Sequence, residues 1–573
     1  MITSRHLLGP IIVALTVCWL HAGHTAARRA VAGKHGVVAA DHPLASLAGL
    51  EILKAGGNAV DAACATAFAL GVVNPAGSGI GGGGFMLVYA PGKQPEVVDF
   101  RETAPAAASR DMYLKKGVAK IAPRRGGLAI AVPGEVAGCS EAVKRWGKLP
   151  LSRVLAPAIK LAQRGFPAGE HLVDTLKSKP FAALKAYNGA IKEIFFVRAK
   201  NAKTPTRAPE LGETLRRPRL ARTLKAIARG GANAFYGGWI AKDIVATVEA
   251  AGGLLTLEDL ANYRPKLRAP LTTTYRGYQI LTTPPPSSGG IAIIETLNLL
   301  SRYKLKEMGH NSSRYLHHLT EALKHAFADR ARHLGDSDFV EVPIAKLTSR
   351  DYADLLAKRI GKTTQPWESY GSGKMQRAGH QDKGTSHLSV TDRSGMTVAL
   401  TTTINLGFGS MIVAKRSGVI LNDQMDDFAS RPGTPNGFGL IQSEKNAVQP
   451  GKRPLSSMSP TIVLKDGKAL LAVGGSGGPT IITGTLQVLL NVLDFRLELG
   501  DAVARSRIHH QWLPNQLWVE SDLPRDVRQA LGARGHKLLS VSKPFTAIQA
   551  VGRTTNALLG ASDPRKGGWP AAD

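Results

Sequence analysis

The sequence predicts a globular α/β protein, on three observations. The chain has 573 residues, 43% of them hydrophobic, and a mean hydropathy of −0.06, which is typical of a globular chain rather than a disordered or fibrous one. Stretches with helical periodicity alternate with apolar, β-branched runs. Runs of glycine between them mark tight turns or close approaches of the backbone. Both two to four domains and a single large α/β unit are compatible with this length.

Residues 1–27 predict an export signal. Arg5 and His6 form a short basic start, an apolar stretch follows over residues 7–20, and small residues stand at 25–27. The apolar run is short for a bilayer span, and the order of the three parts is typical of a cleavable signal peptide. We therefore expect a periplasmic or extracellular protein without an integral membrane span in its mature form. An uncleaved anchor is the lesser alternative.

Cysteine and charge give no sign of a metal or of nucleic acid. Beyond the signal only Cys64 and Cys139 remain; a disulfide between them is left open, and Cys64 is expected to be a small buried residue. No Cys/His cluster has ligand spacing, so no metal and no cofactor is expected. The net charge of +30 is spread along the chain and is densest at residues 216–222. We interpret it as a surface property that favours small anionic substrates, and expect no nucleic-acid partner.

Two helices are expected between about residues 42 and 73. The first should end at the glycine pair 56–57, and the second should begin after Asn58 as N-cap, with Asp61 in its first turn. Apolar strands are expected at residues 85–90 and 96–100. The glycine-rich stretch between helix and strand formally matches GxGxxG, but this order is the reverse of a dinucleotide-binding fingerprint, so we reject such a site.

A hairpin is expected after a polar, irregular segment at about residues 361–384. Taking residues 393–395 as a three-residue loop, with Gly395 in the left-handed position, fixes the register of the two flanking strands. Thr385 then lies opposite Thr403, and Asn405 follows on the same face. The expected hairpin therefore brings two threonine hydroxyls together at its open end.

Thr385 follows Gly384 where the irregular segment meets this hairpin. A hydroxyl in that position can attack the preceding carbonyl and leave Thr385 as a new N-terminus. Its α-amine, with a pKa of roughly 8, can then accept the hydroxyl proton. On the residues alone, the simpler interpretation, that Gly-Thr merely begins a strand, is the stronger one.

Five segments change this balance, because together they resemble γ-glutamyltranspeptidases in sequence and order. They span nearly the whole expected mature chain, and they are DFRETAP at 99–105, GTSHLSV at 384–390, LNDQMDDF at 421–428, KRPLSSMSP at 452–460 and GGSGGP at 474–479. The resemblance implies the four-layer αββα sandwich of N-terminal-nucleophile hydrolases. It also implies cleavage between Gly384 and Thr385 into a large subunit, 28–384, and a small subunit, 385–573, that stay together as a heterodimer.

The resemblance further implies a ping-pong reaction on glutathione or another γ-glutamyl compound, with water, amino acids or dipeptides as acceptors. Thr385 would be the nucleophile and Thr403 its hydrogen-bond partner, with the N–H groups of Gly477 and Gly478 as oxyanion hole. The implied substrate-binding residues fall into two groups. Those for the α-carboxylate are Arg101, Ser456 and Ser457; those for the α-ammonium are Asn405, Gln424 and Asp427.

Three alternatives stay open. GGSGG at 474–478 also matches a GxSxG nucleophile elbow, in which Ser476 would act with Asp501 or Asp522 and with His509 or His536. A cephalosporin or glutaryl acylase of the same superfamily is the second, although such enzymes often lack the acid that Asp427 supplies. An unprocessed relative that binds amino acids or peptides is the third. One departure from the family's bacterial members is Phe438, where several carry tyrosine in the lid loop.

Overall fold

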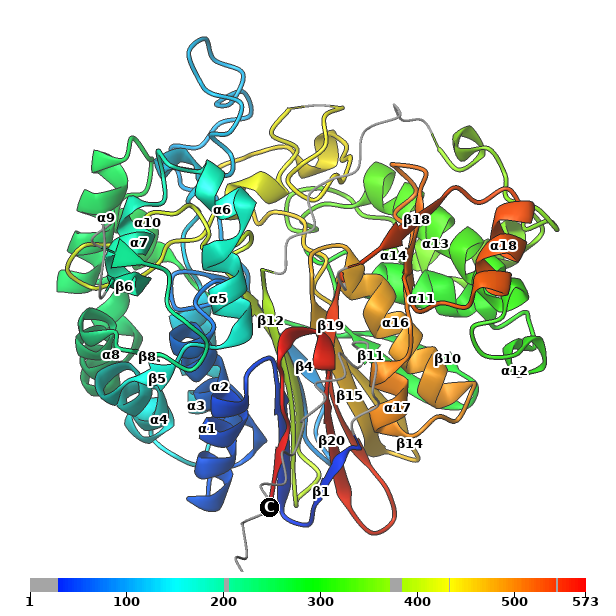
Figure 1. Ribbon diagram of the computed structural model, residues 1–573, viewed down its shortest axis with the longest axis horizontal. Coiled ribbons are helices and arrows are strands. Elements are labelled where there is room, and N and C mark those ends of the chain that lie inside the picture. Colours follow the sequence, from blue (N-terminus) through cyan, green and yellow to red (C-terminus); the bar gives the residue numbers. More distant parts are fainter. Residues whose placement is uncertain (1–28, 200–205, 372–383, 432, 543–544) are drawn as a thin grey trace, which may run out of the picture.

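The computed structural model describes residues 29–199, 206–371, 384–431, 433–542 and 545–573. Two seven-stranded sheets stand face to face in the centre of these residues, and helices cover the outer face of each sheet (Figure 1). The expected αββα sandwich is therefore confirmed. The expected signal at 1–27 and residues 372–383 of the expected irregular segment before Gly384 lie outside the described residues.

The first sheet is antiparallel throughout and has the order β21-β2-β12-β13-β3-β4-β9. Its strands are β21 (Ala571–Ala572), β2 (Gly36–Ala40), β12 (Ser386–Asp392), β13 (Thr397–Thr403), β3 (Gly83–Tyr89), β4 (Glu96–Phe100) and β9 (Lys266–Arg268).

The second sheet is also antiparallel and has the order β1-β20-β19-β15-β14-β11-β10. Its strands are β1 (Val31–Gly33), β20 (Leu558–Ser562), β19 (Ala547–Arg553), β15 (Lys468–Ser476), β14 (Thr461–Lys465), β11 (Tyr278–Thr282) and β10 (Leu271–Tyr275).

Helices cover the outer face of each sheet. On the left of Figure 1, beside the first sheet, are α1 (Pro43–Lys54), α2 (Ala59–Val73), α3 (Glu135–Trp146), α4 (Leu151–Arg164), α5 (Glu170–Lys177), α6 (Lys179–Ala183), α7 (Gly189–Phe195), α8 (Pro218–Tyr236), α9 (Trp239–Ala250) and α10 (Leu257–Asn262). On the right, beside the second sheet, are α11 (Gly289–Leu300), α12 (Leu305–Met308), α13 (Ser313–His333), α14 (Ile344–Leu347), α15 (Arg350–Ala357), α16 (Thr480–Leu493), α17 (Leu499–Ala504) and α18 (Arg525–Ala533).

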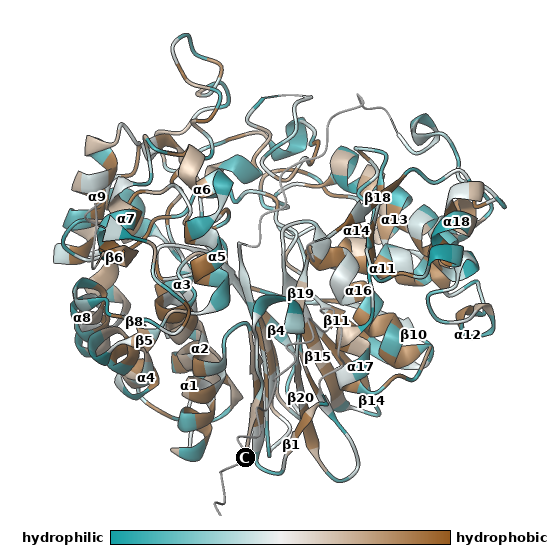
Figure 2. Cartoon of the chain, in the orientation of Figure 1, coloured by the Kyte–Doolittle hydropathy of each residue, from teal (hydrophilic) through white to brown (hydrophobic). Residues whose placement is uncertain are grey.

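Three apolar clusters fill the three interfaces between the four layers. Side chains alternate along a strand. Val38 of β2 therefore packs in one cluster with residues of α1 and α2, whereas its neighbour Val37 packs in another with residues of the second sheet. The third cluster joins the second sheet to α11, α13 and α16. In Figure 2 the central strands and α2 are mostly hydrophobic, whereas α18 at the periphery is mostly hydrophilic. Both faces of both sheets are thus buried.

The start of the chain folds as its capping residues predict. Helix α1 ends at Lys54, just before the glycine pair, and α2 begins after Asn58. The Asn58 side chain accepts hydrogen bonds from the backbone N–H groups of Val60 and Asp61, and the Asp61 carboxylate accepts one from the N–H of Asn58. These are the two reciprocal halves of a capping box, and they fix the first residue of α2.

The predicted hairpin register is confirmed. Ser386 pairs with Thr402 and Thr391 with Thr397, which places Thr385 opposite Thr403. Gly395 has a φ of 88°, the left-handed conformation expected for the third loop residue. Counting outward from one glycine therefore located two hydroxyls at the far end of the hairpin.

Three expectations about single features are also answered. Cys64 and Cys139 are buried and not bonded to each other; the Cys64 Sγ lies 3.7 Å from the main-chain oxygen of Cys139. Among the described helices, none combines the length and the apolarity needed to cross a bilayer. The interpretation of the basic segment as surface is wrong for Arg217, which is buried and donates to the main-chain oxygen of Gly71 at 2.6 Å.

Candidate active site

Thr385 lies directly before β12, with 5% of its surface exposed. Its Oγ1 is 2.8 Å from Oγ1 of Thr403, the last residue of β13, and its N–H donates to the main-chain oxygen of Gly77 at 2.9 Å. Its φ of 74° is a strained conformation for a β-branched residue, at a cost of about 1–3 kcal/mol. The surrounding structure therefore holds this residue in an unfavourable backbone conformation.

The backbone on both sides of Thr385 is packed too closely for a side chain. A Cβ on Gly384 would lie 2.0 Å from the main-chain oxygen of Asn405, and a Cβ on Gly77 would lie 2.9 Å from that of Thr385. Both distances are shorter than real carbon–oxygen contacts. Because both positions are glycine, neighbouring segments of the same chain can pack directly against the Gly384–Thr385 peptide and fix it in place.

Thr403 can exchange a proton with Thr385. Its Oγ1 also accepts a hydrogen bond from the N–H of Asn405 at 2.8 Å. A hydroxyl has one donor and two acceptor positions, so one acceptor position and the O–H remain for Thr385. Thr403 can thus either donate to the Thr385 oxygen or accept its proton.

Asn405 does not follow the strand alternation from which its position was inferred. Strand β13 ends at Thr403, and Asn405 has a φ of 76°. Its Nδ2 donates to the main-chain oxygen of Asp423 at 3.0 Å. The residue still lies beside the Gly384–Thr385 peptide, because its carbonyl oxygen is the atom that excludes a side chain at Gly384.

Arg101 and Asp427, predicted to bind opposite charges of one substrate, form an ion pair with each other. The Arg101 guanidinium, only 1% exposed, contacts Oδ2 of Asp427 through NH2. Gln424 donates to the same oxygen at 2.9 Å, so three of the predicted binding residues are in direct contact. The Oε1 atom of Gln424 is buried and has no hydrogen-bond partner among the described residues.

Ser456 and Ser457 belong to a loop that the turn at 284–290 supports. The N–H of Ser456 donates to Pro286 at 2.8 Å, and its carbonyl accepts the Ser288 hydroxyl at 2.6 Å. Arg101 reaches the same loop through its Nε, 3.2 Å from the Pro454 oxygen. The side chain of Ser457 is the more exposed of the two serines. The structure thus places both serines on a loop that Arg101 contacts.

Two buried carboxyl groups border this region. Burial raises the pKa of Glu102 to about 8, although Arg101 lies 3.6 Å away, and neither Glu102 oxygen has a hydrogen-bond partner among the described side chains and backbone. Burial, followed by the neighbouring Asp427, raises the pKa of Asp426 to about 7. Both groups therefore hold a proton more readily than exposed carboxylates do.

The predicted oxyanion-hole residues lie between β15 and α16. Gly477 and Gly478 have φ values of 129° and 60°, which favour glycine. A Cβ on Gly477 would lie 2.5 Å from the main-chain oxygen of Phe545, and one on Gly478 would lie 2.5 Å from the ring of Phe438. The N-terminus of the 14-residue helix α16 follows immediately, so its N–H groups add positive potential.

Phe438, the departure noted in the lid loop, covers Gly478. It is 7% exposed, and its N–H donates to Oδ1 of Asn436 at 3.0 Å. The loop is fastened to the predicted ammonium site, because the N–H of Gly437 donates to Asp426 at 2.7 Å and Asn436 contacts Asp427 at 3.4 Å. The phenyl ring lies against Gly478 without the hydroxyl that a tyrosine would add.

Lys566 was not among the predicted site residues, yet it contacts the backbone of Thr385. Its Nζ donates to the main-chain oxygen of Thr385 at 2.5 Å, to Ser476 Oγ at 3.1 Å and to Asp41 Oδ2 at 3.0 Å. Asp41 and Lys566 are separated by 525 positions, and no local pattern marks either residue as part of a site.

The nucleophile-elbow alternative is not assembled among the described residues. The hydroxyl of Ser476 is bonded to Lys566 rather than to a histidine. The ring of His509 contacts Thr483 and Gln511, and the ring of His536 contacts His317. Neither histidine can serve as base for Ser476 in this arrangement.

One buried cluster has metal-ligand types, and it lies on α13 and after α18. His317, Glu321 and His536 have ligand atoms within 4.8 Å of one another. The two imidazoles hydrogen-bond to each other at 2.8 Å, and Lys324 donates to Glu321 at 2.9 Å. Donors within the described chain therefore already satisfy this carboxylate, and a neighbouring ammonium opposes a second cation.

Comparison with known proteins agrees with this geometry. A family model described as Gamma-glutamyltranspeptidase matches residues 45–572. The chain is 43% identical over 545 residues to the glutathione hydrolase proenzyme of Escherichia coli (strain K12), covering 93% of this chain and 91% of the relative. It is 38% identical over 536 residues to the glutathione hydrolase proenzyme of Bacillus subtilis (strain 168), covering 91% and 88%.

Two solved structures resemble the fold. A cephalosporin acylase from Bacillus halodurans superposes with a TM-score of 0.84 at 32% identity, covering 96% of this chain and 97% of that chain. The γ-glutamyltranspeptidase of Helicobacter pylori gives a TM-score of 0.54 at 38% identity, covering 59% and 96%. The family match includes every predicted site residue and all strands of the two large sheets except β1 and β2. The chain belongs to the gamma-glutamyltranspeptidase family.

Proposed function

We propose that the protein is a self-processing glutathione hydrolase and γ-glutamyltransferase in which Thr385 is the nucleophile. The observation that carries the proposal is the buried Thr385–Thr403 hydroxyl pair, at 2.8 Å, next to a fixed Gly384–Thr385 peptide. The proposal assigns this pair to two successive reactions, first on the chain itself and then on substrate.

In the first reaction the Thr385 Oγ1 attacks the carbonyl carbon of Gly384. The Gly384–Thr385 C–N bond breaks, an ester forms, and water hydrolyses it to a Gly384 carboxylate and a free Thr385 α-amine. Backbone strain at Thr385 favours this step, because cleavage removes the peptide that constrains it. The products would be a large subunit, ending at Gly384, and a small subunit, beginning at Thr385, that remain one heterodimer.

In the second reaction the α-amine accepts the hydroxyl proton while Oγ1 attacks the γ-carbonyl of the substrate. The N–H groups of Gly477 and Gly478 would stabilise the oxyanion, and the protonated amine would return its proton to the leaving nitrogen. Water or the amine of an amino acid or dipeptide then attacks the γ-glutamyl ester, which frees Thr385. This is a ping-pong sequence.

The substrate's α-carboxylate and α-ammonium would take the places that Arg101 and Asp427 now fill for each other. A zwitterion can offer the guanidinium a carboxylate and offer the carboxylate an ammonium, so neither buried charge is left unpaired. Ser456 and Ser457 would add donors to the carboxylate, and Asn405 and Gln424 would accept from the ammonium. Glutathione and other γ-glutamyl compounds have this zwitterionic end.

Denaturing electrophoresis and N-terminal sequencing test the proposal. Wild-type protein should give two fragments, one of which begins Thr-Ser-His-Leu, whereas Thr385→Ala should stay at full length without activity. Ser476→Ala should still be cut, which separates the proposal from the nucleophile elbow. Full γ-glutamyl activity in a preparation without the Thr385 N-terminus would refute it.

A second candidate activity is hydrolysis of glutaryl amides, favoured by the close superposition on a cephalosporin acylase. Asp427 argues against it, because a glutaryl group has no ammonium to pair with that carboxylate. Turnover of a γ-glutamyl anilide and of the matching glutaryl anilide by the same preparation distinguishes the two. Faster turnover of the glutaryl compound would favour the acylase.

The proposal also includes export of the protein, with residues 1–27 as signal. The supporting observation is the order of basic, apolar and small residues in this segment. Cell fractionation should place the activity outside the cytoplasm, with a large-subunit N-terminus near residue 28. A cytoplasmic enzyme that retains Met1 would contradict this part alone.

A further inference from the structure

The ammonium of Lys566 uses all three of its donors at the candidate site. Its partners are the Thr385 carbonyl, the Ser476 hydroxyl and the Asp41 carboxylate, and its side chain is 1% exposed. A buried lysine is costly unless it is paired and hydrogen-bonded. Here both conditions are met, because the ammonium has a carboxylate partner and a hydrogen bond for each of its N–H groups.

These contacts join the two halves of the proposed catalytic machinery. The carbonyl belongs to the nucleophile itself, whose left-handed conformation needs external support. Ser476 is the last residue of β15 and directly precedes Gly477 and Gly478. One ammonium group therefore links the backbone of the nucleophile to the strand that ends at the proposed oxyanion hole.

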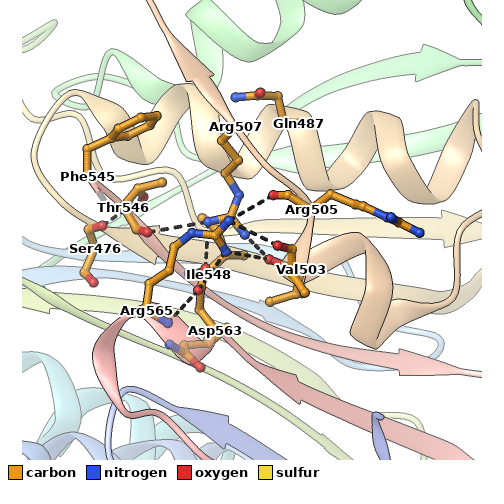
Figure 3. A network of polar contacts seen from close by, with 12 residues as sticks. Ser476, Gln487, Val503, Arg505, Arg507, Phe545, Thr546, Ile548, Asp563 and Arg565 are labelled. Carbon is orange, nitrogen blue, oxygen red and sulfur yellow. Dashed lines mark hydrogen bonds and ion pairs between the residues drawn. The ribbon is translucent and has the colours of Figure 1, made fainter. Parts of the chain in front are cut away.

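Figure 3 shows a second buried network, which holds the residue directly before Lys566. This residue, Arg565, forms ion pairs with Asp563 at 3.1 Å and Glu520 at 2.7 Å, and Arg507 contacts the other Asp563 oxygen at 2.6 Å. The Thr546 hydroxyl, also in Figure 3, donates to the Ser476 carbonyl at 2.9 Å. Both ends of the Lys566–Ser476 contact are thus held independently of the nucleophile.

We propose that Lys566 is a positioning residue for the γ-glutamyl transfer: it aligns the Thr385 main chain with the oxyanion-hole strand and favours the neutral α-amine of Thr385. This inference rests on the proposed function. The oxygen that Lys566 contacts and the α-nitrogen belong to one residue, so the two nitrogens lie within about 6 Å. A positive charge at that range opposes protonation of the amine, and only the neutral amine accepts the hydroxyl proton.

The carboxylate of Asp41 sets the strength of this effect. It accepts from Lys566 at 3.0 Å and from Gln549, at 2.5 Å, through its other oxygen. Removing the lysine charge should make the amine easier to protonate, whereas removing the Asp41 charge should make it harder. The two substitutions therefore predict opposite shifts in pH dependence, which a merely structural role for Lys566 would not produce.

Other titratable groups on the surrounding elements are the same in all variants. Burial lowers the pKa of His387 on β12 to about 3, so it stays neutral, and burial raises the pKa of Glu135 on α3 to about 7. Asp426 and Asp427 lie on the 3-10 turn Gln424–Asp427. Because none of these residues is changed, a difference between variants reports on the Lys566–Asp41 pair.

The experiment measures kcat and KM for a γ-glutamyl anilide across pH, per chain that begins at Thr385. The acidic limb is the low-pH side of the pH profile of kcat/KM, where activity falls as the amine is protonated. For Lys566→Met we expect the midpoint of this limb to move to higher pH by about 0.5–1 unit. We expect kcat to fall about 10- to 100-fold and KM to change less than about threefold. For Asp41→Asn the acidic limb should move down. Ser476→Ala, which removes one contact and keeps both charges, should lower kcat and leave the limb in place.

Lys468→Met is the control for loss of a positive charge, because Lys468 lies on the same strand as Ser476 but is exposed. It should match wild type. An unshifted acidic limb in Lys566→Met, or shifts of the same sign in Lys566→Met and Asp41→Asn, would overturn the inference. If Lys566→Met does not mature, Asp41→Asn, which retains the lysine, decides alone. Wild-type protein that is active without a Thr385 N-terminus would instead overturn the proposed function.

Discussion

Arg101 and Asp427, 326 positions apart, form an ion pair in which the guanidinium is 1% exposed and the carboxylate 12%. In the proposed substrate site Arg101 would bind the α-carboxylate and Asp427 the α-ammonium, so each side chain now fills the place of the other's substrate partner. A ligand that lacks either its carboxylate or its ammonium would separate them and leave one buried charge unpaired. If the proposed function holds, the pair would therefore select for a zwitterion before any contact with the reacting bond.

Substituting Asp427 by Asn should weaken binding of γ-glutamyl substrates by about 10- to 100-fold in kcat/KM, mainly through KM, because the counter-charge for the ammonium is lost. Turnover of the glutaryl analogue should change less. Kinetics on the two anilides measure the ratio. Asp111→Asn is the control, since Asp111 is an exposed acid that also pairs with an arginine. An equal loss of kcat/KM on both substrates would show that Asp427 does not bind the ammonium.

Substituting Thr403 by Val should slow both cleavage of the precursor and turnover, by about 10- to 1,000-fold in kcat, because the Thr385 hydroxyl loses its partner. The chain offers a matched control. Thr391 and Thr397 form the same kind of hydroxyl pair, at 3.0 Å, at the closed end of this hairpin. Thr397→Val should have nearly wild-type kcat; equal losses would assign both effects to folding.

Substituting Gly478 by Ala should lower kcat by about 100-fold or more, because the added carbon meets the Phe438 ring and displaces a proposed oxyanion donor. Gly467→Ala separates this effect from backbone strain. Gly467 has a φ of 69° and nothing within 4 Å of the added carbon. It should lose some thermal stability and keep its kcat. A Gly478→Ala enzyme with normal kcat would remove that residue from the oxyanion hole.

Glu102 should make the protein less stable as pH rises. Its pKa is raised from 4.5 to about 8 by burial, so the folded state holds the proton more tightly than the unfolded state does. The stabilising contribution is complete below pH 4.5 and declines until about pH 8. The Tm of Glu102→Gln minus that of wild type should therefore rise across this interval. The exposed Glu258→Gln should give a constant difference; a constant difference for Glu102→Gln would contradict the argument.

Local geometry explains what could be predicted from the sequence. A hairpin loop fixes the register of two strands, so the contact between Thr385 and Thr403 followed from the position of Gly395. Helix α2 began at its predicted cap for the same reason, because Asn58 and Asp61 satisfy neighbouring backbone groups. Both inferences depend on residues within 20 positions of one another.

Contacts between distant segments could not be predicted in this way. Lys566 contacts Thr385 only through the tertiary fold, since Lys566 follows β20 of the second sheet and Thr385 precedes β12 of the first. The position of Asn405 could not be predicted from strand alternation, because β13 ends at Thr403 and the backbone of Asn405 is left-handed. Arg217 was interpreted as surface charge, yet its guanidinium satisfies the Gly71 and Gly418 carbonyls in the interior. The ion pair of Arg101 with Asp427 is likewise tertiary.

The strand order has a consequence for the chain after the proposed cleavage. In the first sheet, β12 and β13 lie between β2 and β3, and in the second, β20, β19, β15 and β14 lie between β1 and β11. Within both sheets, strands from before and after position 385 are therefore joined by ladders of backbone hydrogen bonds. Separating the two polypeptides would break the hydrogen bonds between strands in both sheets. The cleaved protein should therefore unfold as one cooperative unit. Its pieces, made separately, should not reassemble by simple docking of preformed halves.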